Sequence, residues 1–283
     1  MIGDVTEIAG LAEVATAHHL FLIDQFGVLH DGRDAYPGAI AALQSLKAAG
    51  KVSIILSNSG KRAGPNAERL LRLGFPPGSF SHVVSSGEVN WHAIHDGRLG
   101  APFKRGARVY LVGKPGDDYQ LDGLDLVLVP RADEADLILI LGTGAPDVAL
   151  IEYQGLLAPA ARAGLPAVCA NPDRHMLSAQ GLVPGPGAIA EVYQQLGGQV
   201  HFIGKPHAGI YDFALGLMPD VPPARVLAIG DSVEHDIAGA ARMGLPSALI
   251  RGGILAGFDG RALAGLYAEH RARATYVLDR LVW

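Results

Sequence analysis

The chain has 283 residues, 49% hydrophobic and 18% charged, and a formal net charge of −5. This composition is typical of a well-packed globular protein with one large or two smaller domains, and it lacks the basic balance of a nucleic-acid-binding protein. A single cysteine, Cys169, excludes an internal disulfide. No apolar run approaches the roughly 18 residues of a membrane span, and residues 1–19 lack the pattern of a secretory signal. We therefore expect a cytoplasmic protein without nucleic-acid or membrane partners.

Short apolar strands alternate with helices that begin at proline or end at glycine along most of the chain. In chain order, the first elements predicted are an amphipathic helix over 5–19, a strand over 20–23, a helix over 37–49, a strand over 52–56 and a helix over 65–73. The same pattern returns with strands over 165–170, 200–204 and 226–231, and a helix and edge strand are predicted over 261–283. Repeated strand–helix units of this kind predict an α/β fold with a doubly wound parallel sheet.

The middle of the chain carries strand–helix units of its own. Strands are predicted over 108–113, 124–130 and 135–142, and a long helix over 147–163. This is too much structure for one loop, so we predict an inserted α/β domain. Its edges fall where glycine and proline gather, which gives a core domain of residues 1–86 and 188–283 and an inserted domain of residues 87–187.

Polar side chains follow four of the predicted apolar strands directly. They are Asp24, the run Ser57-Asn58-Ser59, Lys205, and the pair Asp231 and Asp236. Each group alone is explained by turn or helix-start chemistry. Together they favour a common site, because ligands of open parallel sheets bind outside the carboxyl ends of the strands.

These residue types suit phosphoryl transfer. Mg²⁺ prefers a few carboxylate oxygens together with water and a substrate phosphate. Asp24 and Asp231 would be direct ligands, and Asp236 would orient a metal-bound water. Asp24 would attack phosphorus to form an aspartyl-phosphate. Lys205 would offset the negative charge, and Ser57 would donate to a phosphoryl oxygen.

The set of motifs resembles the haloacid dehalogenase superfamily. The matching stretches are Asp24-Gln25-Phe26-Gly27-Val28, Ser57-Asn58, Gly204-Lys205-Pro206, and Gly230-Asp231-Ser232 with Asp236. An insertion of this size between the second and third motifs, with Asn171-Pro172-Asp173, is similar to the class IIA branch, the nitrophenylphosphatase-like enzymes. The resemblance implies a Rossmann-like core, an α/β cap domain over 87–187 that contacts a small phosphorylated substrate, and Mg²⁺ as cofactor.

By that resemblance, Asp24, Ser57 and Lys205 are catalytic, and Asp231 and Asp236 serve the metal. Substrate contacts are expected from Asn58, Ser59, Asn171 and Asp173. The sequence leaves the oligomeric state open, but class IIA relatives often dimerise through the cap, so a homodimer is one possibility, with Trp91 and Tyr153 either at such a contact or within the core of the cap.

One position departs from the family pattern. Family phosphatases usually carry a second aspartate two residues after the nucleophile, as general acid and base, and here that residue is Phe26. Its backbone carbonyl still suits Mg²⁺, but its ring transfers no proton. General acid–base catalysis contributes about 10²–10⁴ in rate, so substrates with poor leaving groups suffer most. His30 or Asp31 is an alternative acid, although both also fit a turn.

Three functions therefore stay open. The first is a Mg²⁺-dependent phosphatase that is slow or restricted to good leaving groups. The second is a non-catalytic protein that binds a phosphorylated metabolite, for which Phe26 is the main support. The third is a dehalogenase, because those members of the superfamily carry an aromatic residue at the position of Phe26, but they need no Mg²⁺.

Overall fold

The computed structural model describes residues 5–178, 181–255 and 257–283. Contacts along the chain divide it into two compact units. Unit 1 comprises residues 1–57, 64–84 and 205–283, and unit 2 comprises residues 58–63 and 85–204. Whether these units are independently folding domains stays a prediction. No helix among the described residues is long and apolar enough to cross a membrane.

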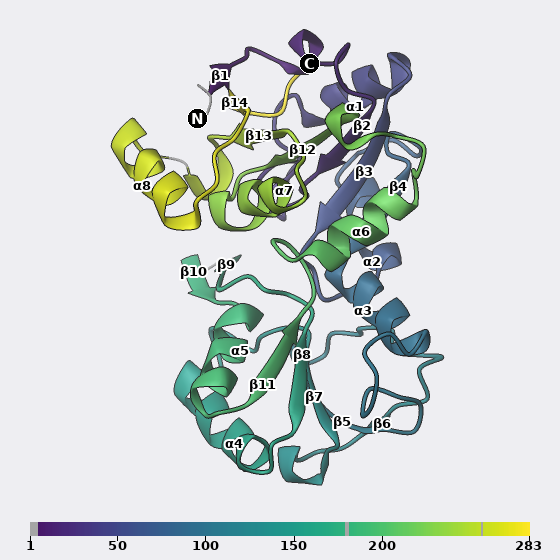
Figure 1. The fold of residues 1–283 in the computed structure, drawn as a ribbon, viewed down its shortest axis with the longest axis vertical. Helices are drawn as coiled ribbons and strands as arrows, with labels where there is room; N and C mark the ends of the chain where they lie inside the picture. The colour runs from purple at the N-terminus through teal and green to yellow at the C-terminus, as the bar shows by residue number, and fades with distance from the viewer. Residues whose placement is uncertain (1–4, 179–180, 256) are drawn as a thin grey trace. The chain divides into compact units, whose positions relative to one another are not determined.

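Unit 1 is built on a seven-stranded sheet (Figure 1). Its order is β1 (Thr6–Glu7), β14 (Tyr276–Leu278), β13 (Ser247–Ile250), β12 (Val226–Gly230), β2 (Leu20–Ile23), β3 (Val52–Ser57) and β4 (His82–Ser85). The pairs from β1 to β3 are parallel. The helices of this unit are α1 (Ala39–Ala48), α2 (Ala63–Arg72), α6 (Ala208–Gly216), α7 (Ala238–Arg242) and α8 (Gly260–His270).

Burial on both faces explains why the central strands are apolar throughout. All four residues of β2 are buried. On one face Phe21 and Ile23 pack in a core that includes Leu43 of α1. On the other face Leu249 packs with Ile237 and with residues beside α8. Alternate residues of a strand point to opposite faces, so a sheet covered on both sides needs a continuous apolar run.

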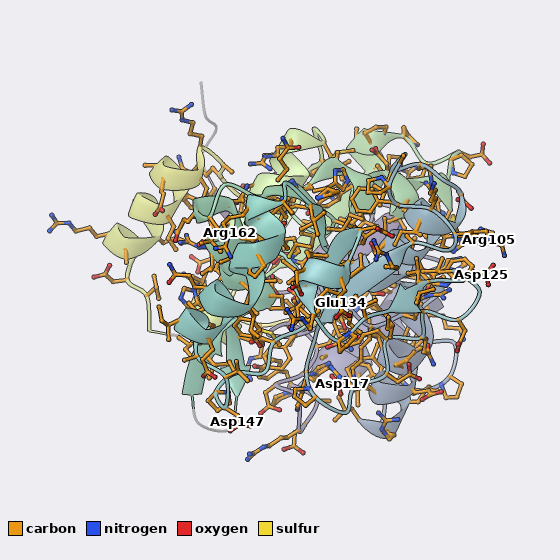
Figure 2. All side chains as sticks on the ribbon, turned by 90° about the horizontal axis from the view of Figure 1, so that it is seen from below. Arg105, Asp117, Asp125, Glu134, Asp147 and Arg162 are labelled. Carbon is orange, nitrogen blue, oxygen red and sulfur yellow. The ribbon has the colours of Figure 1, made fainter. Side chains whose placement is uncertain are left out.

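Unit 2 contains a five-stranded parallel sheet. The order is β11 (Gln199–Phe202), β8 (Pro166–Cys169), β7 (Leu137–Ile140), β5 (Arg108–Val112) and β6 (Val127–Leu128). Its helices are α3 (Ser86–His95), α4 (Leu150–Arg162) and α5 (Pro186–Gln195), and β9 (His175–Ser178) and β10 (Gly181–Pro184) pair antiparallel. Arg105, before β5, and Asp125, before β6, form an exposed ion pair of 2.8 Å and lie side by side in Figure 2.

The predicted fold class, an α/β protein with parallel sheets, is confirmed. Four local predictions differ from the structure. Residues 5–19 form β1 and a short 3₁₀ turn, because their backbone bonds go to the C-terminal segment, as from Ile8 N to Val277 O (3.0 Å). The predicted strand over 124–130 shortens to β6, and the edge of the first sheet is β1 rather than β14.

The fourth difference concerns the second boundary of the insertion. Residues 188–204, expected in the core domain, lie in unit 2. The reason is that β11 pairs with β8, and α5 packs in the same apolar core as α4 through Ile189 and Tyr193. An apolar strand sequence does not specify which sheet it joins.

Candidate active site

Adjacent strand ends bring two carboxylates together in unit 1. Asp24 follows β2, Asp231 follows β12, and the two strands are paired with Ile23 opposite Ile229. Asp236 comes from the next turn of the chain. Carboxylate oxygens of all three residues lie within 4.8 Å of one another, and all three residues are buried. Oxygen ligands this close together suit a hard divalent cation.

Lys205 neutralises part of this charge. Its side chain is 3% exposed, and its ammonium group donates to Asp24 Oδ1 and, over 2.7 Å, to Asp236 Oδ1. The second oxygen of Asp236 accepts from Ser232 N at 3.1 Å. Three carboxylates and one ammonium leave the site with a formal charge of −2 when all four groups are ionised.

The pKa values of the site reflect this imbalance. Burial raises the pKa of Asp24 well above its usual value against the attraction of Lys205, and the neighbouring carboxylates of Asp236 and Asp231 raise it further. Burial alone would lower the pKa of Lys205, but Asp236 and Asp24 hold it above its usual value. Lys205 is therefore a fixed cation, whereas ionised Asp24 needs more positive charge than the lysine supplies.

Three glycines leave room for the carboxylates. A Cβ atom at Gly27 would lie 2.0 Å from Asp231 Oδ2, one at Gly253 would lie 1.9 Å from the same atom, and one at Gly230 would lie 1.9 Å from Asp236 Cγ. Gly27 and Gly253 also have positive φ angles, +90° and +59°. Sequence reasoning missed Gly253. The available signal was its place just after strand 247–250, the same strand-end position that singled out the acids.

Phe26 and His30 pack against each other beside the site. Their rings meet edge to face with centroids 5.6 Å apart, and Gly27 N donates to His30 O at 3.0 Å. His30 is fully buried, its Nδ1 accepts from Gly32 N, and burial lowers its pKa to about 4. A neutral imidazole is a poor acid, which argues against His30 as a substitute for the missing aspartate. Asp31 is exposed and accepts from Arg33 N and Asp34 N, as a turn residue does.

The remaining predicted phosphate and substrate residues lie in both units. Ser57 is buried at the end of β3, the neighbour of β2 in the first sheet. In unit 2, Asn58 Nδ2 donates to Asp173 Oδ1 at 2.7 Å, and Asp173 N donates to Asn171 Oδ1 at 3.1 Å. Ser59 accepts from Lys61 N through its hydroxyl. Their substrate contacts stay a prediction.

Comparison with known proteins agrees with the family that the sequence motifs resemble. A model of haloacid dehalogenase-like hydrolases matches residues 21–127, and a second, HAD-hydrolase-like model matches 202–282. D-glycerol 3-phosphate phosphatase of Mycobacterium tuberculosis is 30% identical over 272 residues, which are 94% of this chain and 71% of that protein. Chronophin of Bos taurus is 30% identical over 87% of this chain and 85% of its own length.

Solved structures agree. A haloacid dehalogenase-like hydrolase from Brucella suis has a TM-score of 0.84 at 30% identity, covering 97% of this chain and 100% of that one. The glycerol phosphate phosphatase from Mycobacterium tuberculosis, in complex with magnesium, has a TM-score of 0.71 at 28% identity, covering 93% and 76%. The chain belongs to the haloacid dehalogenase-like hydrolases. Within them it falls in the class IIA phosphatase branch.

Proposed function

We propose that the protein is a Mg²⁺-dependent phosphoric monoester hydrolase that forms an aspartyl-phosphate at Asp24. The observation that supports this most directly is the buried cluster of Asp24, Asp231 and Asp236 around Lys205 at the ends of two parallel strands. Its three carboxylates within 4.8 Å and its formal charge of −2 fit a divalent cation. Asp24, Asp231 and the Phe26 carbonyl would hold the cation, with Asp236 in support.

When bound, the cation would offset charge on the phosphoryl oxygens and keep Asp24 ionised for attack. Asp24 would attack phosphorus in line, the phosphorus–oxygen bond to the leaving group would break, and the phosphoryl group would pass to the carboxylate. Lys205 would neutralise charge on the nucleophile and the phosphoryl group, and the Ser57 hydroxyl would donate to an equatorial oxygen. Water would then hydrolyse the aspartyl-phosphate.

Phe26 limits both chemical steps. Its ring neither protonates a leaving alkoxide nor activates the water that attacks the aspartyl-phosphate, and the neutral, buried His30 does not replace it. We therefore propose slow turnover restricted to good leaving groups, such as acyl phosphates and substituted phenyl phosphates. Relatives named for glycerol phosphate act on an alkyl phosphate, and that substrate class is the one most affected by the loss of an acid.

Unit 2 is the proposed source of substrate contacts. Asn58, Ser59, Asn171 and Asp173 are the residues proposed to contact a small phosphorylated metabolite.

A homodimer through the same unit is supported by its edge strand β6, where Val127 and Leu128 are 52% and 56% exposed. Tyr153 is buried with its hydroxyl accepting from Gly144 N, so it packs within the unit instead. Light scattering of Val127→Lys against the unaltered protein tests the dimer: a monomeric variant beside a dimeric parent is expected.

The function is tested by hydrolysis of 4-nitrophenyl phosphate with Mg²⁺ and after chelation, beside Asp24→Asn. We expect turnover that needs both the metal and the carboxylate of Asp24. A folded, Mg²⁺-binding protein without turnover would favour the phosphometabolite-binding alternative. Turnover of 2-haloacids after complete chelation would favour the dehalogenase alternative.

A further inference from the structure

Asp236 lies on an unusual piece of backbone. Residues Val233–Ile237 form a π-helical turn, in which Asp236 N and Ile237 N both donate to the carbonyl of Ser232, at 3.0 and 3.1 Å. Turns of this kind are rare and occur frequently at functional sites. The wide turn sets where the Asp236 carboxylate points, so whatever stabilises the turn also positions that carboxylate.

A single short segment holds Asp236 at two points. Lys205 binds its side chain, with Nζ 2.7 Å from Oδ1. Six residues later, in the first turn of α6, the Tyr211 hydroxyl lies 3.3 Å from the main-chain carbonyl oxygen of Asp236 and 3.5 Å from that of His235. Tyr211 is 1% exposed. The same segment thus binds both the carboxylate and the backbone of one residue.

Gly239 makes room for this hydroxyl. A Cβ atom at Gly239 would lie 2.3 Å from the Tyr211 oxygen, 2.7 Å from Cε2 and 2.8 Å from Cζ. Real Cβ contacts are never this short, so any side chain at position 239 would displace the ring or the helix. The ring is therefore enclosed between its own helix and the start of α7, and its hydroxyl has little freedom to leave the two carbonyl groups.

We propose that Tyr211 is a positioning residue for the metal site, acting through the main chain of Asp236. Its hydroxyl donates to the carbonyl groups of the π-helical turn and so keeps the Asp236 carboxylate in reach of Lys205 and of the cation. This proposal rests on the proposed function, since it assumes that the cluster binds Mg²⁺. Burial holds the pKa of Tyr211 above its usual value, so the hydroxyl stays protonated as a donor.

The test removes one oxygen atom. Tyr211→Phe keeps the ring that packs against Gly239 and deletes only the hydroxyl. Its matched control is Tyr193→Phe in unit 2, a fully buried tyrosine whose hydroxyl donates to a main-chain carbonyl, Leu165 O, at 2.6 Å. Both variants lose one buried hydrogen bond, so any purely structural effect appears in both.

The readout is Mg²⁺ affinity by isothermal titration calorimetry, without substrate. Removing a group that orients a metal ligand typically costs 10–100-fold in affinity, so we expect Tyr211→Phe to bind Mg²⁺ about tenfold more weakly and Tyr193→Phe to match the unaltered protein. Gly239→Ala, which reaches the same contact from the other side, should weaken binding in the same direction. Circular dichroism checks that each variant is folded.

The outcomes separate the two proposals. If the unaltered protein binds no Mg²⁺, the proposed function fails. If it binds Mg²⁺ and folded Tyr211→Phe binds equally well, the positioning role is wrong. An equal loss in Tyr211→Phe and Tyr193→Phe would also overturn it, because the effect would then be one of general stability. If Tyr211→Phe does not fold, unchanged affinity in folded Gly239→Ala would refute the role.

Discussion

Replacing Asp24 by Asn should make the metal-free protein more stable while abolishing its activity. Two unit charges 4.8 Å apart, the greatest separation within the cluster, repel each other by about 3.5 kcal/mol at an effective dielectric constant of 20. When all three carboxylates are ionised, Asp24 therefore meets at least about 7 kcal/mol of repulsion from Asp231 and Asp236. The attraction to Lys205, which forms a close ion pair with Asp24, is of similar size, and Asp236 shares that ammonium.

Repulsion and attraction are therefore nearly equal, and the burial of Asp24, the largest cause of its raised pKa, leaves its charge unfavourable. We expect Asp24→Asn to raise the free energy of unfolding by about 1–2 kcal/mol without metal, which is about 2–8 °C in Tm for a unit of this size. The raised pKa of Asp24 fixes the pH dependence. The folded state binds more protons than the unfolded state, so the unaltered protein loses stability as pH rises above the unfolded value of 3.8. The advantage of the variant should therefore be small near pH 4 and larger at pH 8.

Differential scanning calorimetry in chelator measures this, with Asp212→Asn on the exposed side of α6 as the control that removes an exposed carboxylate outside the cluster. Saturating Mg²⁺ should reverse the order, because ligand at 100 times Kd adds about 2.7 kcal/mol to the protein that binds it. A lower Tm for Asp24→Asn in chelator at pH 8, with the control unchanged, would refute the reasoning. It would mean that the ion pair with Lys205 outweighs the repulsion.

Three further outcomes are expected. Gly253→Ala should weaken Mg²⁺ binding at least tenfold in calorimetry, because its Cβ would meet the side chain of Asp231. The control Gly244→Ala, also at positive φ but with open space around it, should leave the affinity unchanged. Equal affinities of the two variants would show that Gly253 does not make room for Asp231. Because burial lowers the pKa of His30 to about 4, folding excludes the proton that the unfolded histidine binds, and this should cost about 2 kcal/mol of the free energy of unfolding between pH 7.5 and pH 5. His30→Asn should remove this loss. Urea unfolding at both pH values measures it, and an equal loss in the variant and the unaltered protein would contradict the prediction. Phe26→Asp should raise kcat/KM for alkyl phosphates more than for 4-nitrophenyl phosphate, and the two increases should differ by a factor of up to about 10². Equal increases for both substrates would show that no general acid was missing.

The acidic cluster was predictable because it depends on topology alone. Asp24 and Asp231 follow neighbouring parallel strands, and the structure brings them together with Asp236 at one edge of that sheet. Lys205 follows a strand of the other sheet, but its ammonium group forms ion pairs with Asp24 and Asp236. The fold class followed from the same alternation of strands and helices.

Other features depend on contacts between distant segments, which the local pattern does not encode. β11 looks like any buried strand, and only its pairing with β8 assigns it to unit 2. Residues 5–19 have a helical pattern, but hydrogen bonds to the C-terminal segment hold part of them extended. Tyr211 is an ordinary apolar position of a helix until the fold places its hydroxyl on the turn that carries Asp236.

The central claim is that Asp24 becomes phosphorylated, and rapid-quench kinetics with 4-nitrophenyl phosphate and Mg²⁺ test it most directly. Because Phe26 provides no base for hydrolysis of the aspartyl-phosphate, that intermediate should accumulate. We predict a burst of nitrophenolate of about one equivalent per chain and a phosphoryl group on the peptide that contains Asp24 in acid-quenched protein. Turnover without a burst or a phosphorylated peptide, and undiminished in Asp24→Asn, would contradict the account.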